Sequence, residues 1–161
     1  MIINDKIIGL INYRIQQEEY SSRLYLAMSK WLNFNGYAGA AKLWQKYSDE
    51  ELKHAGWAYS YLEDLNILPI VPALDNPPSE FEGLCNIIHD SLDHEVDVTN
   101  QCSELAKSAL AENDFMTLEL AQKYLKEQVE EIAKTTYWVD RLEAFGETPE
   151  ALRLLDNEMG E

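Results

Sequence analysis

The sequence predicts an all-α protein, a four-helix bundle with one long crossover and a short fifth helix at the C-terminal end. Three observations predict it. Apolar residues recur three or four positions apart over four long segments, no segment alternates with a period of two, and four of the five prolines lie within residues 67–79. Each apolar stripe needs a partner face, and a bundle supplies one to all four helices.

Five helices are expected within one domain covering residues 1–161, over about 5–34, 40–66, 80–111, 114–145 and 149–158. A turn signal at 33–36 (Asn-Phe-Asn-Gly) separates the first two helices, and a short break at 112–114 separates the third from the fourth. The last helix is expected to start with Thr148 as its N-cap and Pro149 at its first helical position.

The lengths of the connections predict the topology. Short links make the first two helices antiparallel, and the third and fourth likewise. The segment 67–79 spans about 43 Å when extended, close to the length of roughly 45 Å for a helix of about 30 residues. It can therefore run the length of the bundle and place the third helix parallel to the second, in the order up-down-down-up.

Composition excludes several classes of function. The 161 residues hold 29 Asp and Glu against 13 Lys and Arg, a net charge of −16, which argues against nucleic acid or an anionic membrane as a partner. Residues 1–6 lack the basic start of a signal peptide, and no apolar run is long enough to cross a membrane. Because nothing indicates an oxidising compartment, we expect a cytoplasmic protein.

Each apolar stripe is broken near its middle by an acid or an amide. The breaks are Glu18, Glu51 with His54, Glu95 and Gln128. They lie close to the expected midpoints of the four helices, so they should meet at one level in the centre of the bundle whichever way the helices run. The stripes themselves contain no Lys or Arg, which leaves these buried acids without a counter-charge.

A bound cation is the expected counter-charge. Moving an ionised carboxylate out of water costs several kcal/mol unless it is paired or binds metal. Glu51 and His54 form a Glu-x-x-His on one helical face, and carboxylate oxygens with an imidazole nitrogen suit Fe, Mn or Zn. With Glu131 as a fourth acid, four carboxylates balance two divalent metals. The alternative is that these acids bind no metal. They would then be either buried and hydrogen-bonded, or on the surface because the inward-facing side of the helix was assigned incorrectly.

These residues resemble the ferritins, specifically the non-haem ferritins of prokaryotes, over nearly the whole chain. Di-iron bundles of this kind are the known setting of Glu-x-x-His on facing helices. The resemblance is carried by Glu18–Ser22 with Tyr25 and Met28, Glu50–Ala55, His94-Glu95, Tyr124–Glu130, and the short helix after Pro149.

The resemblance implies a dinuclear ferroxidase centre. Its residues would be Glu18, Glu51, His54, Glu95 and Gln128. Glu51 would bridge the two irons, and Tyr25 would hydrogen-bond the site and supply an electron. Bacterial members add a third iron position, which in this sequence corresponds to Glu50, Glu127, Glu130 and Glu131.

The resemblance also implies a function. Fe(II) would be oxidised to Fe(III) by dioxygen or hydrogen peroxide, and ferric oxide mineral would be stored in a hollow homo-oligomer of 24 subunits. No haem is expected, because Leu52 stands where bacterioferritins use a haem-binding Met. The pore acids of animal ferritins correspond to Leu118 and Ala121, which leaves the route of iron access open.

Two other interpretations stay open. One is a shell or ferritin-like di-iron protein that holds divalent metal such as Zn or Mn without efficient oxidation or mineral storage. The other is an inert structural bundle. Among further residues, Trp44 and Tyr47 are expected to pack in the core, whereas His89 and His94 are expected to be solvated surface groups.

Overall fold

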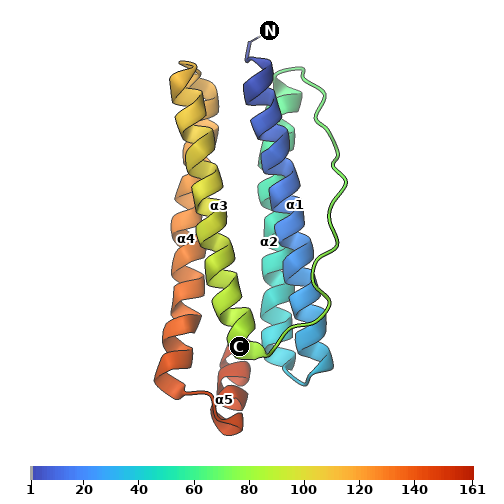
Figure 1. Cartoon of the computed structure of the whole chain (residues 1–161), viewed down its shortest axis with the longest axis vertical. Coiled ribbons are helices and arrows are strands. Elements are labelled where there is room, and N and C mark those ends of the chain that lie inside the picture. Colours follow the sequence, from blue (N-terminus) through green and yellow to red (C-terminus); the bar gives the residue numbers. More distant parts are fainter. Residues whose placement is uncertain (1) are drawn as a thin grey trace.

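The protein is described by a computed structural model over residues 2–161, all of whose regular elements in that range are helices (Figure 1). The helices are α1 (Asp5–Phe34), α2 (Ala38–Asp64), α3 (Leu84–Ala111), α4 (Phe115–Phe145) and α5 (Pro149–Met159). No helix in the described part of the chain is long and apolar enough to cross a membrane.

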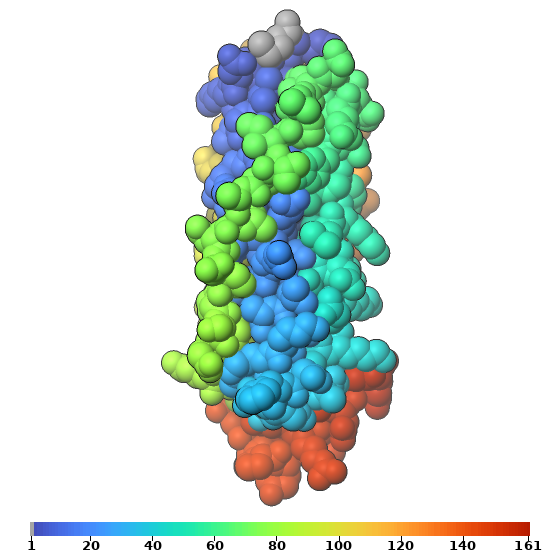
Figure 2. Space-filling view, turned by 90° about the vertical axis from the view of Figure 1, so that its right-hand side faces the viewer, coloured from blue at the N-terminus to red at the C-terminus, as the bar shows by residue number. Residues whose placement is uncertain are grey.

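The predicted topology is confirmed. α1 and α2 form one antiparallel hairpin, and α3 and α4 form the other (Figure 1). Residues 65–83 form an extended crossover that runs along α1 from one end of the bundle to the other (Figures 1 and 2). α3 therefore runs parallel to α2.

Side chains of α1 hold the crossover in place. Asn12 accepts a hydrogen bond from the backbone N–H of Ile70 at 2.8 Å, and Gln16 donates one to the carbonyl of Ala73 at 3.3 Å. Because an extended segment forms no hydrogen bonds within its own backbone, these contacts satisfy backbone groups that would otherwise need water. The crossover ends later than expected: α3 starts at Leu84, since Phe81 packs edge-on against Trp31 of α1 instead of starting a helix.

α5 packs across the start of α2. The N-cap of α2, Tyr37, makes no side-chain capping bond, and Asp156 of α5 instead accepts a hydrogen bond from Ala40 N at 2.7 Å. The two helices come so close that a Cβ on Gly39 would lie 1.9 Å from the carbonyl oxygen of Asp156. This cap from a distant helix extends α2 back to Ala38, before the expected position 40.

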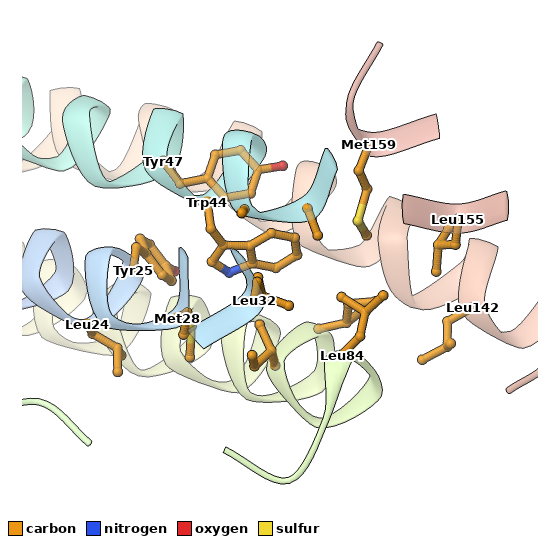
Figure 3. Packing of buried hydrophobic residues seen from close by; sticks show 14 residues of the cluster. Leu24, Tyr25, Met28, Leu32, Trp44, Tyr47, Leu84, Leu142, Leu155 and Met159 are labelled. Carbon is orange, nitrogen blue, oxygen red and sulfur yellow. The ribbon is translucent and has the colours of Figure 1, made fainter. Parts of the chain in front are cut away.

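Two apolar clusters fill the bundle. The first covers Leu24–Leu32 of α1 and extends to Leu155 and Met159 of α5, with Trp44 packed among them (Figure 3). The second covers Ile3, just before α1, with Ile7–Ile15 of α1 and the opposite ends of the other long helices. Along α1 the gap between the clusters contains Glu18, so the polar residues form a layer with apolar packing on both sides.

Replacing Asp156 with alanine is expected to lower the free energy of unfolding by about 1–2 kcal/mol, because the N-terminus of α2 loses its cap. Chemical denaturation measures the change. The matched control is Asn157→Ala, an exposed neighbour on α5 that should have little effect. Equal losses in the two variants would show that the Asp156 contact does not stabilise the fold.

Candidate metal centre

Four acids, one from each long helix, are buried together in the polar layer. Glu18, Glu51, Glu95 and Glu131 are each at most 4% exposed. The apolar periodicity of the first three helices turns Glu18, Glu51 and Glu95 inward, because each occupies the place of a core residue on its stripe. These three acids meet at one level as predicted, and Glu131 joins them from one turn beyond Gln128, the residue expected there on the fourth helix.

His54 lies at the centre of the acids. Its Nδ1 is 3.1 Å from Glu51 Oε2 and 3.8 Å from Glu18 Oε2, and its Nε2 is 3.2 Å from Glu127 Oε1. Glu51 and His54 share one face of α2 because they are three residues apart. Both ring nitrogens thus face carboxylate oxygens from neighbouring helices.

The possible ligand atoms fall into three groups. In each group, all the ligand atoms lie within 4.8 Å of one another. The groups are Glu18 with Glu51 and His54; Glu51 with Glu95 and Glu131; and His54 with Glu127 and Glu131. Adjacent groups share a residue. This overlap is the arrangement needed for two ions held by a common carboxylate.

Gln128 and Tyr25 hold Glu95 from two sides. The Gln128 amide donates to Glu95 Oε2 at 2.9 Å and approaches Thr99 Oγ1 at 3.2 Å. The Tyr25 hydroxyl donates to the other oxygen, Oε1. Burial, with the charges of Glu95 and Glu51, raises the pKa of Tyr25 well above its ordinary value, so the phenol keeps its proton for this bond.

The acids destabilise one another when ionised. Burial and the neighbouring Glu18 carboxylate raise the pKa of Glu51 well above its ordinary value. Burial also raises the pKa of Glu131 to about 7, although Lys134 acts in the opposite direction. A divalent ion would relieve both effects at once, because it supplies the missing positive charge.

Arg14 corrects the expectation that the acids have no basic neighbour. Its side chain is 2% exposed, and Nε lies 2.9 Å from Glu18 Oε1, at an angle unsuited to a hydrogen bond. The guanidinium also approaches Cys102 Sγ and the ring of Tyr124. Position 14 follows Ile11 by three residues and precedes Glu18 by four. Helical spacing alone therefore places it beside the stripe, which is the signal that could have found it.

Lys134 is a second basic residue at the site. Its Nζ lies 2.8 Å from Glu50 Oε2 and 2.9 Å from Glu131 Oε1. Burial works to lower the pKa of Lys134, but the two carboxylates outweigh it and raise the pKa above its ordinary value. Of the acids expected at a third iron position, Glu127 faces His54, whereas Glu130 is exposed and belongs to none of the three groups.

The expectation for His94 was wrong. This histidine is half-buried, with Nε2 2.8 Å from Ser21 Oγ and its ring edge-on to Tyr25 at 5.7 Å. Burial lowers its pKa. The expected surface position fails because the face of α3 next to Glu95 is covered by α1. His89, one and a half turns earlier, is exposed as expected.

The donor set fits a first-row transition metal. It offers carboxylate oxygens and one imidazole nitrogen, which suit iron, manganese or zinc. Glu18 Oε2 is buried and has no hydrogen-bond donor among the described residues, yet it points toward His54. A buried carboxylate oxygen without a donor is costly, and a metal ion would satisfy it.

Comparison with known proteins decides the family. The sequence profile of the ferritin-like domain matches residues 8–145. The chain belongs to the ferritin family. Ferritin relatives include a probable bacterial non-heme ferritin-like protein of Haemophilus influenzae, 30% identical over 99% of this chain and 96% of the relative. A bacterial non-heme ferritin of Escherichia coli is also 30% identical, over 98% of this chain and 96% of its own.

Solved ferritin structures agree with the fold. An open pore ferritin from the hyperthermophilic archaeon Archaeoglobus fulgidus superposes with a TM-score of 0.95 at 33% identity. The match covers 98% of this chain and 97% of the archaeal one. Membership of the ferritin family supports a role in iron storage, and the carboxylate and histidine groups are candidates for holding the iron.

The metal-free protein is expected to lose stability as the pH rises from 5 to 8. The pKa of Glu131 is about 7 in the folded chain against 4.5 ordinarily. The folded state therefore holds an extra proton between these values, and the stabilisation present below 4.5 is lost as the pH passes 7. For this one group the loss is on the order of 3 kcal/mol.

Denaturation of chelator-treated protein at both pH values measures this dependence. Glu131→Gln should reduce the drop in unfolding free energy, because the amide does not ionise. The neighbouring Glu130→Gln is the control and should keep the full drop, since Glu130 is exposed. Identical drops in both variants would contradict the account of Glu131.

Proposed function

We propose that this ferritin-family chain oxidises Fe(II) to Fe(III) with dioxygen at the four-acid centre. We further propose that it stores the product as ferric oxide in a hollow, cytoplasmic homo-oligomer of 24 subunits. Iron is the substrate and cargo of this reaction. The observation that carries the proposal is the set of three overlapping ligand groups, formed by His54 and by carboxylates of all four long helices.

The ligands themselves favour oxidation. Carboxylate oxygens are hard donors that stabilise Fe(III) more than Fe(II), so a site built from them lowers the potential of bound iron. Glu51 belongs to two of the three groups and is the proposed bridge between two ions. Glu18 and Glu95 are the proposed ligands on either side of it.

The surrounding residues keep these ligands in position. Gln128 and Tyr25 hold the two oxygens of Glu95, and Tyr124 donates a hydrogen bond to the backbone carbonyl of His54 at 2.5 Å. Such contacts around a metal site orient the ligands before the ion arrives. Tyr25 remains the proposed source of an electron during oxidation.

Assembly into a shell is supported by the exposed crossover. Leu68 is 90% exposed, Val71 78% and Ile70 62%, which is costly for apolar side chains unless another chain covers them. A relative with the same fold is described as an open pore ferritin, a description that implies a shell. The net charge of −16 is consistent with the proposed shell, because acidic residues along its channels would raise the local concentration of cations such as Fe(II).

A metal-holding shell without rapid oxidation is the second candidate. The observation that favours it is Arg14, whose positive charge lies beside one of the proposed iron ligands, Glu18. A fixed cation there opposes the extra positive charge of Fe(III) more than the charge of Fe(II), so it disfavours oxidation at that position. This candidate predicts tight divalent binding but no fast use of oxygen.

Replacing Glu51 with glutamine is expected to slow the fast phase of iron oxidation by roughly tenfold or more, because the bridging carboxylate is lost. Stopped-flow absorbance after mixing metal-free protein with Fe(II) and air measures it. The control is Glu63→Gln, an exposed acid on the same helix, which should keep the wild-type rate. If Glu51→Gln kept the wild-type fast phase, the four-acid centre would not be the site of oxidation. If the wild-type protein itself showed no fast phase, the second candidate would be favoured.

A further inference from the structure

Lys134 fills a position that a cation would occupy. Its ammonium lies between two carboxylates from different helices, 2.8 Å from Glu50 of α2 and 2.9 Å from Glu131 of α4. The same nitrogen is 4.9 Å from the centroid of the Tyr47 ring, whose face attracts positive charge. The lysine is thus held on three sides, and its side chain is only 33% exposed.

Lys134 also contacts an acid of the metal centre. Glu131 is a member of two ligand groups, one with Glu51 and Glu95 and one with His54 and Glu127. Its residue is 4% exposed, and its Oε1, the atom facing Lys134, has no hydrogen-bond partner in the described chain. That oxygen therefore has one close positive neighbour, the lysine.

The charges of the site leave room for two divalent ions. Six carboxylates line it: Glu18, Glu50, Glu51, Glu95, Glu127 and Glu131. They carry six negative charges when ionised, whereas Arg14 and Lys134 carry two positive ones. Lys46 also lies 3.9 Å from Glu50, but it is left out of this count because its side chain is 70% exposed and solvent screens its charge. The remaining four negative charges equal the charge of two divalent ions. A third ion would leave the cluster with excess positive charge next to a buried ammonium, which is unfavourable in a poorly solvated site.

We propose that Lys134 is a tethered cation that takes the place of a third metal ion between Glu50 and Glu131, and so limits the centre to two metal ions per chain. This inference rests on the proposed function, because it assumes that divalent metal binds at the neighbouring acids. The third iron position expected from the sequence would then fill only where the lysine is removed or displaced.

The test counts zinc ions in crystals of the assembled protein soaked in Zn²⁺, by anomalous diffraction at the zinc edge. Zinc accepts the same carboxylate and imidazole ligands and does not change oxidation state, so binding is separated from oxidation. Wild type should show two ions in the centre, with Lys134 in place. Lys134→Met should show a third ion between Glu50 and Glu131.

Two further variants act as controls. Lys134→Arg keeps the tethered charge and should show two ions. Lys126→Met removes an exposed lysine from the same helix and should also show two. A lysine that merely stabilised the fold would change the melting temperature of Lys134→Met but not its zinc count.

The outcomes separate this inference from the function on which it rests. Two ions in Lys134→Met, or a third ion in the wild type beside a displaced lysine, would overturn the role of Lys134 alone. Zinc at neither of the two main positions in any variant would overturn the divalent centre, and the role of Lys134 with it. Zinc in the expected numbers without fast iron oxidation would support the role of Lys134 and reject the ferroxidase activity.

Discussion

Mutual repulsion among four buried carboxylates is the constraint on which the rest of the structure depends. Glu18, Glu51, Glu95 and Glu131 come from four helices and meet where a bundle of this kind would otherwise have apolar packing. Desolvation and like charge both oppose their ionisation. The apolar clusters on either side of the acid layer supply the burial energy that keeps the helices together despite it.

The chain offsets this repulsion in three ways. Arg14 and Lys134 each bring a permanent positive charge to an acid, at the two sides of the layer. The raised pKa of Glu51 and Glu131 lets protons neutralise part of what remains. Gln128 and Tyr25 donate hydrogen bonds to Glu95. These contacts compensate the negative charge of the four acids only in part.

Much of the site could be predicted from sequence because helical periodicity fixes the side of a helix on which a residue lies. The stripes and the Glu-x-x-His were enough to place Glu51, His54 and the other mid-helix acids together. Arg14 and Lys134 were missed for a physical reason. Each lies beside the apolar stripe of its helix, not on it, although an acid of the same helix is only three or four residues away. The second acid beside Lys134, Glu50, lies on α2, so that contact depends on how the helices pack. His94 was misplaced for a related reason, because its exposure depends on how closely α1 covers α3.

Some helix starts are determined by neighbouring residues, and others by contacts with distant parts of the chain. The N-caps of α1, α4 and α5 accept hydrogen bonds from their own helices, and the expected starts there differ from the observed ones by at most one residue. The start of α2 depends on Asp156, over a hundred residues away in sequence. The start of α3 depends on Phe81 packing against Trp31. Contacts of this kind leave no periodic signal in the local sequence.

The most direct test of the central claim is anomalous diffraction at the iron edge, from crystals soaked in Fe(II) without oxygen. Iron is expected among Glu18, Glu51 and His54, and a second iron among Glu51, Glu95 and Glu131, with Glu51 between them. Iron bound only at surface acids, with the four buried carboxylates still in their metal-free contacts, would contradict the claim.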